Sequence, residues 1–400
     1  MVFLNLICDT LLTMYIKLTS ELIEYAINDR SSRAYTVLKM LDWCCYQGNH
    51  FISGDLKELV EIEVHFKNDL RCLSNLLSTY SLNEEILKSF KWHLEFITDK
   101  NQTPLTRKDV ETHTIYVNIN DDFEVYRECH LLAENLNDIK IFNQILTYYK
   151  KCHSYSNVNT RIYPILGGGS TTKDVYAHEI LLGKSLVLTI VDSDKHFPNA
   201  QLGDTAKGVK RIDEEKKAFN ACCYIMESVL EIENLIPLHV YKNYVNNHLE
   251  LKPAMDAIIK IHESNPALLN YYDYKEGITP LLLENANPNN NSYDIALIVQ
   301  NNIKKIIQDK QEEWNKFREL LNNFEFLTNQ DKDRIFKKKE KSECYIPGLG
   351  KNILENILNS NLFNGINVDK EHLSDIQKQE YENIGEIIYN WACSSNPIRI

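Results

Sequence analysis

The stretch SLVLTIVDSDKHFPNA, residues 185–200, decides how the fold is interpreted. Its first half is a nearly continuous apolar run, which is typical of a parallel strand whose two faces are both covered. The run ends in Asp192 and Asp194, two carboxylates one residue apart. Like charges at the end of a buried strand repel, and each is driven toward its neutral form unless a cation compensates. The stretch therefore predicts a buried strand that ends in a site for a cation.

Strand-like and helix-like patterns alternate on both sides of this stretch. The strand-like runs are HTIYVNI, CHLLAE, RIYPIL and SLVLTIVD, and the helix-like runs between them are DIKIFNQILTYYKKC, TKDVYAHEILL and EEKKAFNACCYIMESVLE. Strands that alternate with helices indicate a parallel sheet with crossover helices. We therefore predict an α/β domain over residues 111–250.

Helical periodicity flanks this domain on both sides. The runs ELIEYAIN, AYTVLKMLDW and ILKSFKWHLEFI predict a helical N-terminal domain over residues 1–110, and helical patterns after residue 250 predict a helical C-terminal region over 251–400. The first residues, MVFLNLICDTLLTMYIKL, lack the positive start and the cleavage site of a signal peptide. No run reaches the roughly 18 apolar residues of a membrane span. We expect a buried N-terminal helix in a cytoplasmic protein without a membrane partner.

The bulk composition is that of an ordinary globular chain. Of 400 residues, 44% are hydrophobic and 25% charged, and the net charge is −12. This charge argues against a surface coated in basic residues, but it allows a local basic groove or an acidic site that binds metal ions. The ten cysteines include no CxxC, so reduced thiols packed as small hydrophobes are favoured over a zinc site or a disulfide framework.

Acidic residues also follow a second strand. Glu134 closes HLLAE, and Asp138 begins the next helix. Because the carboxyl ends of parallel strands meet at one edge of a sheet, we expect Glu134 to face Asp192 and Asp194. Mg²⁺, or Mn²⁺ in its place, binds such carboxylates together with water and substrate phosphate. A DxD sequence also arises in turns, which Asp stabilises, but acids at two strand ends favour a metal site.

Three glycines, Gly167, Gly168 and Gly169, lie between the strand RIYPIL and a helix that begins near Thr172. A strand, a glycine turn and a helix N-terminus favour phosphate binding. The bare backbone would let a phosphodiester approach the metal centre, with Lys173 nearby. The alternative is a tight turn that needs positive φ. Neither GxxxxGK[ST] nor GxGxxG occurs, so we predict neither an ATPase nor a dinucleotide site in this chain.

The order LLAENLND, YPILGGGS, LTIVDSDKHFPNA resembles the TOPRIM domain of topoisomerases, bacterial primases, recombination-mediator proteins and OLD-family nucleases. That fold is a small parallel, Rossmann-like sheet flanked by helices. Its signature is a strand-end Glu, usually followed by Gly and then by an Asp, with a strand-end DxD further on. Glu134, Asp138, Asp192 and Asp194 match these positions. Asn135 replaces the usual Gly, and because Asn tolerates left-handed geometry, we expect the turn to be preserved.

The resemblance covers roughly residues 115–245 and implies a function. It implies a Mg²⁺-dependent endonuclease that cleaves nucleic acid, with DNA as the expected substrate, and that acts as an effector of antiphage defence. The segment IENLIPLHV, residues 232–240, resembles an element after the DxD in OLD-like and standalone antiphage TOPRIM nucleases, which makes Glu233 a further metal ligand. The alternative for Glu233 is a solvent-exposed residue at a helix C-terminus.

The resemblance also implies the roles of the site residues. The acids hold one or two ions, Glu134 serves as ligand or general base, and a lysine stabilises the developing charge. Catalytic roles fall to Glu134, Asp192, Asp194 and Lys195, metal ligation to Glu134, Asp138, Asp192, Asp194 and Glu233, and phosphate approach to Gly167, Gly168, Gly169 and Lys173.

Partners follow from the same resemblance. Related defence nucleases often work with an ATPase, so an ATPase or another sensor protein in trans is expected beside the nucleic acid, which is DNA or tRNA. Long amphipathic C-terminal helices offer a surface for a homo-oligomer. Two other functions stay open: a tRNA-cleaving toxin with the same metal centre, and a non-catalytic interaction protein whose acids form a degenerate site.

Overall fold

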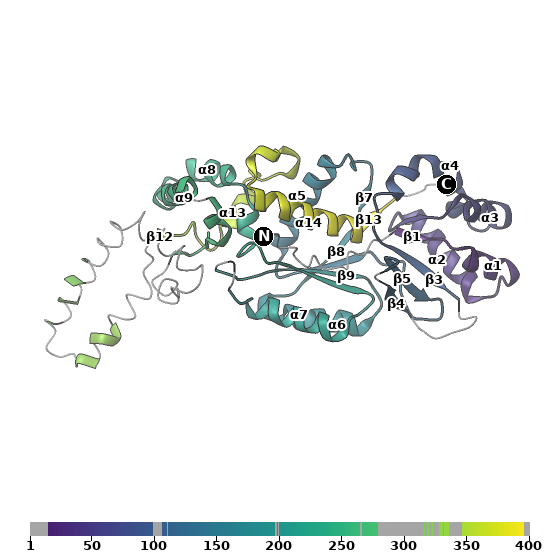
Figure 1. Cartoon of the computed structure of the whole chain (residues 1–400), viewed down its shortest axis with the longest axis horizontal. Helices are drawn as coiled ribbons and strands as arrows, with labels where there is room; N and C mark the ends of the chain where they lie inside the picture. The colour runs from purple at the N-terminus through teal and green to yellow at the C-terminus, as the bar shows by residue number, and fades with distance from the viewer. Residues whose placement is uncertain are drawn as a thin grey trace. The chain divides into compact units, whose positions relative to one another are not determined.

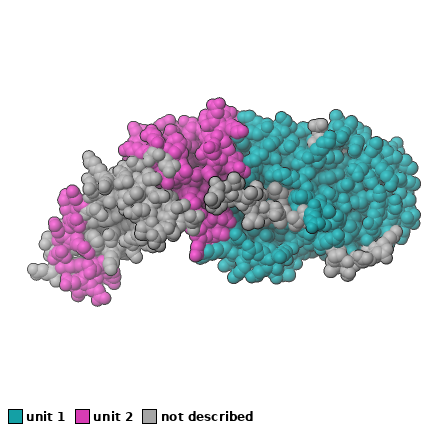
Figure 2. Space-filling model, viewed as in Figure 1, with its two compact units in different colours: residues 1–191, 204–225, 381–400 teal, residues 192–203, 226–380 magenta. Residues whose placement is uncertain are grey.

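The computed structural model describes residues 15–98, 106–109, 111–196, 198, 200–264, 266–278 and 346–395, with isolated positions between 312 and 335. The chain forms two compact units, each assembled from separate segments (Figure 2). Unit 1 comprises residues 1–191, 204–225 and 381–400, and unit 2 comprises residues 192–203 and 226–380.

A five-stranded sheet forms the N-terminal part of unit 1, in the order β2-β1-β3-β5-β4. Strand β1 pairs in parallel with β2 and β3, β3 pairs in parallel with β5, and β4 is antiparallel to β5. The strands are β1 (Tyr15–Lys17), β2 (Phe51–Ser53), β3 (His93–Ile97), β4 (Arg107–Asp109) and β5 (Thr114–Asn118). The helices that join them are α1 (Ser20–Asn28), α2 (Arg33–Gln47), α3 (Leu56–Phe66) and α4 (Arg71–Leu87).

The prediction of a helical N-terminal domain over residues 1–110 missed this sheet. The four helices are present, but four of the five strands also fall within residues 1–110. Strands β1 and β2 are three residues long and almost entirely buried. Such short parallel strands show no alternation of apolar and polar residues, so the sequence pattern does not distinguish them from part of a buried helix. Strand β1 lies inside the segment expected to be an N-terminal helix, and residues 1–14 of that segment lie outside the described residues.

A second sheet in unit 1 has the order β10-β9-β6-β8. Strand β6 pairs in parallel with both β8 and β9, which confirms an α/β fold with a parallel-rich sheet. The strands are β6 (Cys129–Ala133), β8 (Ile162–Leu166), β9 (Val187–Asp192) and β10 (Ala221–Met226). In the edge strand β8, Pro164 offers no N–H to a further strand, which discourages pairing between molecules.

Helices cover both faces of this second sheet (Figure 1). Helices α6 (Thr172–Leu182) and α7 (Asp204–Lys216) lie on one face, and α5 (Leu136–Cys152) and the end of α14 (Asp375–Ala392) lie on the other. Helix α14 approaches α5 closely at Gly385, where an added Cβ would lie 2.4 Å from the Cβ of Tyr149. A short pair, β7 (Asn159–Thr160) and β13 (Cys393–Ser394), ties the end of the chain to this unit.

Unit 2 is mostly helical in its described part. Its helices are η2 (Ile232–Leu235), α8 (Leu238–Asn246), η3 (Leu249–Leu251), α9 (Lys252–Ser264), η4 (Pro266–Tyr271), α13 (Ile353–Asn359), η5 (Gly365–Asn367) and η6 (Lys370–His372). Strands β11 (Gly277–Ile278) and β12 (Ile346–Pro347) pair antiparallel. The long amphipathic helices expected to form an oligomer surface fall largely outside the described residues. None of the helices in the described ranges is long and apolar enough to span a bilayer.

Candidate functional site

The aspartates of the DxD sequence lie where β9 ends, in a turn that belongs to unit 2. The side chain of Ser193 between them is fully buried. The N–H of Asp194 donates to the carbonyl of Leu230 at 3.0 Å, and the N–H of Gly203 donates to the carbonyl of Ser193 at 2.8 Å. Backbone hydrogen bonds therefore hold the turn on both sides, while Asp192 is half-buried and Asp194 exposed.

The position of the Asp194 carboxylate requires a glycine at residue 203. Asp194 has φ of 54°, a left-handed conformation that Asp adopts more readily than most residues. A Cβ added at Gly203 would lie 2.0 Å from Oδ2 of Asp194. A side chain at position 203 would thus displace the carboxylate. A non-glycine residue held at positive φ by its surroundings is typical of functional sites.

Lys195, predicted to act in catalysis, is buried beside this turn. Its N–H donates to Oγ of Ser193 at 3.1 Å, and its Nζ lies 2.6 Å from Oε2 of Glu227. The ion pair with Glu227 holds the ammonium group of Lys195, the residue that follows Asp194, in place.

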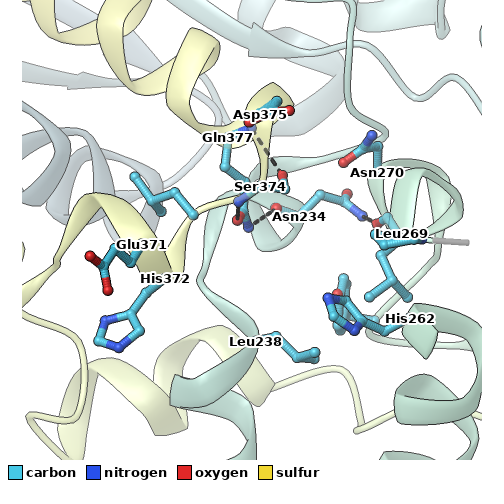
Figure 3. Close-up of a pocket in the computed structure, with 13 residues that line it drawn as sticks. Asn234, Leu238, His262, Leu269, Asn270, Glu371, His372, Ser374, Asp375 and Gln377 are labelled. Atoms are coloured by element: carbon cyan, nitrogen blue, oxygen red, sulfur yellow. Dashed lines mark hydrogen bonds between the residues drawn. The ribbon is translucent and has the colours of Figure 1, made fainter.

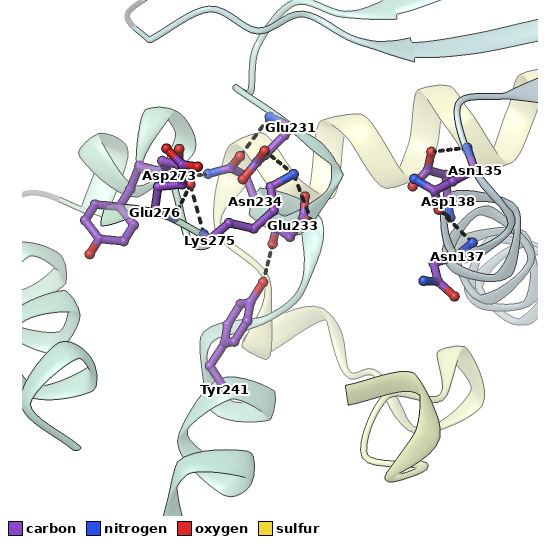
Figure 4. A network of polar contacts seen from close by, with 11 residues as sticks. Asn135, Asn137, Asp138, Glu231, Glu233, Asn234, Tyr241, Asp273, Lys275 and Glu276 are labelled. Atoms are coloured by element: carbon purple, nitrogen blue, oxygen red, sulfur yellow. Dashed lines mark hydrogen bonds and ion pairs between the residues drawn. The ribbon is translucent and has the colours of Figure 1, made fainter. Parts of the chain in front are cut away.

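Two glutamates in unit 2 share one lysine. Glu231 and Glu233 are 7% and 3% exposed, and Nζ of Lys275 lies 2.6 Å from Oε2 of Glu231 and 3.4 Å from Oε1 of Glu233 (Figure 4). Glu231 caps η2, since its N–H donates to Oδ1 of Asn234 at 2.9 Å. Glu233 is therefore not the solvent-exposed helix end that was the alternative to a ligand.

Neighbouring groups hold both partners of this ion pair in place. The hydroxyl of Tyr241 donates to the carbonyl of Glu233 at 2.7 Å. Oδ1 of Asp273 accepts from the N–H groups of Lys275 and Glu276 at 2.9 and 2.7 Å, which forms the turn that carries Lys275. This local turn therefore positions Lys275.

Burial and mutual repulsion shift the protonation of this cluster. Burial first, and the Glu233 carboxylate second, raise the pKa of Glu231 to about 9. Burial also raises the pKa of Glu233, and Lys275 opposes that rise. Burial alone would lower the pKa of Lys275, but Glu233, Glu231 and Asp192 together raise it above its ordinary value. Burial therefore favours a proton on Glu231 at neutral pH, and Asp192 acts on the same cation as the two glutamates.

Two carboxylate oxygens of the cluster have no partner among the described residues. Oε1 of Glu231 and Oε2 of Glu233 are buried and accept no hydrogen bond from any residue that the structure describes. A buried oxygen without a partner costs roughly 1–3 kcal/mol, so these atoms suit a cation, and Mg²⁺ prefers oxygen ligands of this kind. Within the described ranges, however, no three His, Cys, Asp or Glu side chains gather in an arrangement that could hold a metal ion.

The other predicted acids, Glu134 and Asp138, lie in unit 1. Glu134 follows β6 directly and is half-buried. Oδ2 of Asp138 accepts from the N–H of Asn135 at 3.0 Å, and Oδ1 of Asn135 accepts from the N–H groups of Asn137 and Asp138 at 2.8 and 3.2 Å (Figure 4). Asp138 therefore forms a capping box at the start of α5, a structural role beside the predicted one.

Asn135 does not adopt the left-handed geometry that was expected for it. Its φ is −147° and its ψ is 173°, an extended conformation that any residue can adopt. The reason is that Asn135 is the N-cap of α5, and N-cap residues have extended backbones.

The glycine turn needs positive φ, as the structural alternative predicted. Gly168 and Gly169 have φ of 73° and 67°, and the N–H of Gly168 donates to the carbonyl of Glu134 at 2.9 Å. Lys173 packs its aliphatic part against Gly208 of α7. The turn thus borders the predicted base in unit 1, and its role in phosphate approach stays a prediction.

Unit 2 holds part of the predicted site and adds two residues that sequence reasoning missed. A signal existed for Glu231, because a second Glu two residues before Glu233 repeats the spacing of the DxD pair. Lys275 had no such signal, since only the fold brings it to the glutamates. The predicted residues in unit 2 are Asp192, Asp194, Lys195 and Glu233, and those in unit 1 are Glu134, Asp138, Gly167, Gly168, Gly169 and Lys173.

Comparisons with known proteins found no match: no family model, no curated protein and no solved structure is significantly similar to this chain.

Proposed function

We propose that this chain is a divalent-metal-dependent phosphodiesterase that cleaves nucleic acid, as the TOPRIM nucleases it resembles do. One observation carries the proposal. Asp192 of the DxD turn, together with Glu231 and Glu233, acts on a single ammonium group, that of Lys275. Asp192 directly precedes the turn in which Asp194 has a left-handed backbone, and three acids that act on one cation favour a functional site over a simple turn.

The chemistry follows from the residue types. A bound Mg²⁺ or Mn²⁺ supplies Lewis acidity and lowers the pKa of a bound water. Asp192 and Asp194 would hold the ion, with Glu233 and Asp138 as further ligands. Glu134 is the proposed ligand or general base.

The lysines act on the substrate in this proposal. The ammonium groups of Lys195 and Lys275 offset negative charge on the phosphate as the bond breaks. Ion pairs at 2.6 Å, of Lys195 with Glu227 and of Lys275 with Glu231, hold these ammonium groups in place. A chain with a net charge of −12 needs such local cations, or metal ions, to bind a polyanion.

DNA is the proposed substrate, and antiphage defence with an ATPase or sensor in trans is the proposed setting. The test is cleavage of plasmid DNA and of tRNA by the purified protein with Mg²⁺ or Mn²⁺. We expect Asp192→Asn and Glu134→Gln to lose roughly 100-fold or more in rate, and the exposed control Glu250→Gln to lose nothing. Cleavage of tRNA but not DNA would favour the ribonuclease function, and wild-type rates in both site variants would refute the proposal.

A specific observation favours the second candidate, a non-catalytic interaction protein. Asp138 is engaged in a capping box, and Lys275 already offsets the buried glutamates, so these acids have structural roles without a metal. Thermal unfolding with and without Mn²⁺ separates the two. A rise in Tm that disappears in Asp194→Ala supports a metal site, and no rise supports the interaction protein.

A further inference from the structure

Helix α7 in unit 1 carries positive charge on the exposed face of its first half. Lys207, Lys210 and Arg211 are all exposed, and their spacing of three and four residues places their side chains on one face of the helix. The opposite face is buried through Ala206 and Val209. Three cations therefore lie together within little more than one helical turn, in a chain whose net charge is −12.

Lys173 of the neighbouring helix adds a fourth cation. Helices α6 and α7 lie side by side (Figure 1), and the hydroxyl of Tyr176 in α6 donates to Oδ1 of Asp213 in α7. The aliphatic part of Lys173 crosses α7 at Gly208, where an added Cβ would lie 2.6 Å from Cδ of the lysine. This packing holds the end of the Lys173 side chain close to the cations of α7. The name α7 basic surface is used below for Lys173, Lys207, Lys210 and Arg211.

The order of charges along α7 does not stabilise the helix. The three cations of α7 precede a run of three acids, residues 213–215, whereas the helix dipole favours acids at the start and cations at the end. Asp204 and Lys216, at the two ends, are the exceptions that follow the favourable order. The cations, three and four residues apart, also repel one another. This arrangement therefore favours the binding of an anion over a role in stability.

We propose that the α7 basic surface binds the phosphate backbone of nucleic acid. Ammonium and guanidinium groups pair with phosphate oxygens, and several cations on one face suit a polymer with a charge at every phosphate. Arg211 also lies 3.9 Å from the exposed Glu215, but such exposed ion pairs are weak and leave the guanidinium available. Phosphate contacts carry no sequence information, so this surface binds nucleic acid irrespective of its sequence.

The α7 basic surface borders the glycine turn of the same unit. Helix α7 contacts η1 (Gly169–Thr171), which begins in that turn. The N–H of Gly168 in the turn donates to the carbonyl of Glu134 at 2.9 Å. Nucleic acid held by α7 therefore lies close to the turn that adjoins the proposed ligand or general base. This link to cleavage rests on the proposed function, whereas the binding of nucleic acid does not.

The cavity of unit 2 offers no comparable set of cations. It has a volume of about 330 Å³, and Figure 3 shows residues that line it, among them His262, Glu371 and His372. None of the thirteen lining residues that the structure describes is Arg or Lys. The cavity thus lacks the usual cationic partners of a phosphate, which the α7 basic surface supplies.

The experiment is fluorescence anisotropy of labelled single-stranded DNA, duplex DNA and tRNA with the full chain, in EDTA to prevent cleavage and at several KCl concentrations. Wild-type protein is expected to bind, with an affinity that falls as salt rises, and the probe bound most tightly identifies the polymer. The combined variant Lys207→Gln, Lys210→Gln and Arg211→Gln is expected to bind about tenfold more weakly or worse. Its slope of log affinity against log salt is expected to be smaller by about 2 to 3.

The matched control removes the same charge from exposed lysines elsewhere. It combines Lys67→Gln, Lys88→Gln and Lys351→Gln, whose lysines are 69%, 66% and 81% exposed and each pair with a glutamate. This control is expected to bind within about twofold of wild type, because these lysines contact no phosphate. Urea unfolding is expected to show no loss of stability in the α7 variant, since the substitutions remove repulsion between cations.

A gain of binding supplies an independent check. Glu214 is exposed on the same face of α7, seven residues after Lys207, and Glu214→Lys is expected to tighten binding about threefold or more. Three results would overturn the proposal: no binding of any of the three probes by the wild type, equal binding by the α7 variant and its control, or tighter binding of polyglutamate than of nucleic acid. Binding without cleavage counts only against the proposed function, and cleavage with unchanged binding in the α7 variant counts only against this inference.

Discussion

The ammonium group of Lys275 lies 2.6 Å from Oε2 of Glu231, and the same group reaches Glu233 at 3.4 Å. The acids of unit 2 thus have a counterion supplied by the chain itself. From the sequence, only a bound metal ion was expected to offset the repulsion between clustered carboxylates, whereas in the structure Lys275 offsets part of it. A metal ion remains suited to the two buried oxygens that accept no hydrogen bond from the described part of the chain.

Removing this counterion is expected to destabilise unit 2. Lys275→Met leaves Glu231 and Glu233 buried without a cation, and breaking a buried pair from one side costs roughly 3 kcal/mol of unfolding free energy. Urea unfolding measures the loss. Lys351→Met is the control, because Lys351 pairs with Glu276 at 3.5 Å while 81% exposed and is expected to lose at most about 1 kcal/mol. Equal losses in the two variants would mean that the Lys275 pairs do not stabilise the fold.

Gly203→Ala is expected to abolish metal-dependent cleavage while leaving the fold intact. The new Cβ would lie 2.0 Å from Oδ2 of Asp194, so the carboxylate must move. The control is Gly54→Ala, where the new Cβ would lie 3.1 Å from the Cβ of Glu58, a residue outside the predicted site. Cleavage rates and circular dichroism of both variants check this. Full activity in Gly203→Ala would show that the position of Asp194 does not matter.

Asn135→Ala is expected to lower stability by about 1 kcal/mol, and Asn135→Gly by only a few tenths. The reason is that Asn135 caps α5 through Asn137 and Asp138, and Gly is tolerated at an N-cap. Thermal or urea unfolding compares the two variants. A Gly variant as unstable as the Ala variant would contradict the capping role and point to another constraint at this position.

His50 is expected to make unit 1 sensitive to acid. Burial lowers the pKa of His50 to about 4, although backbone contacts with Val125 and Arg127 oppose the shift. The unfolded chain binds a proton near pH 6.5 and the folded chain does not, so stability is full above pH 6.5 and falls as the pH drops toward 4. Between pH 6.5 and 5 the loss is about 2 kcal/mol.

The measurement for His50 is urea unfolding at both pH values. In His50→Gln the part of the pH dependence that comes from this residue is expected to disappear. The idea fails if His50→Gln and wild type lose the same stability on acidification.

The sequence predicted β6, β8 and β9 of the second sheet, but the run EEKKAFNACCYIMESVLE, predicted as a helix, contains its fourth strand, β10. Strands β6 and β9 are apolar runs of five and six residues between helical patterns, so the local signal matches the fold. Strands β1 and β2 have three residues each and exist because they pair with each other and with β3. Pairing between distant segments leaves no local pattern.

The distinction between local sequence patterns and contacts between distant segments also applies to the candidate site. The DxD turn, the capping acid Asp138 and the glycine turn are local in sequence, and the structure has each as a turn or a cap. The sequence around Asn135, with Asp138 three residues later, is itself a capping pattern that could have been recognised. Lys275 reaches Glu231 across more than 40 residues, and no periodicity predicts such a contact.

Binding of Mn²⁺, followed by electron paramagnetic resonance of the free ion, addresses whether acids from both strand ends share a metal site. We expect wild-type protein to bind Mn²⁺, and Glu134→Gln and Asp192→Asn each to weaken binding by tenfold or more, while Glu250→Gln binds like wild type. A Glu134→Gln variant that binds Mn²⁺ as tightly as the wild type would contradict the shared site, and no binding by the wild type would contradict metal dependence altogether.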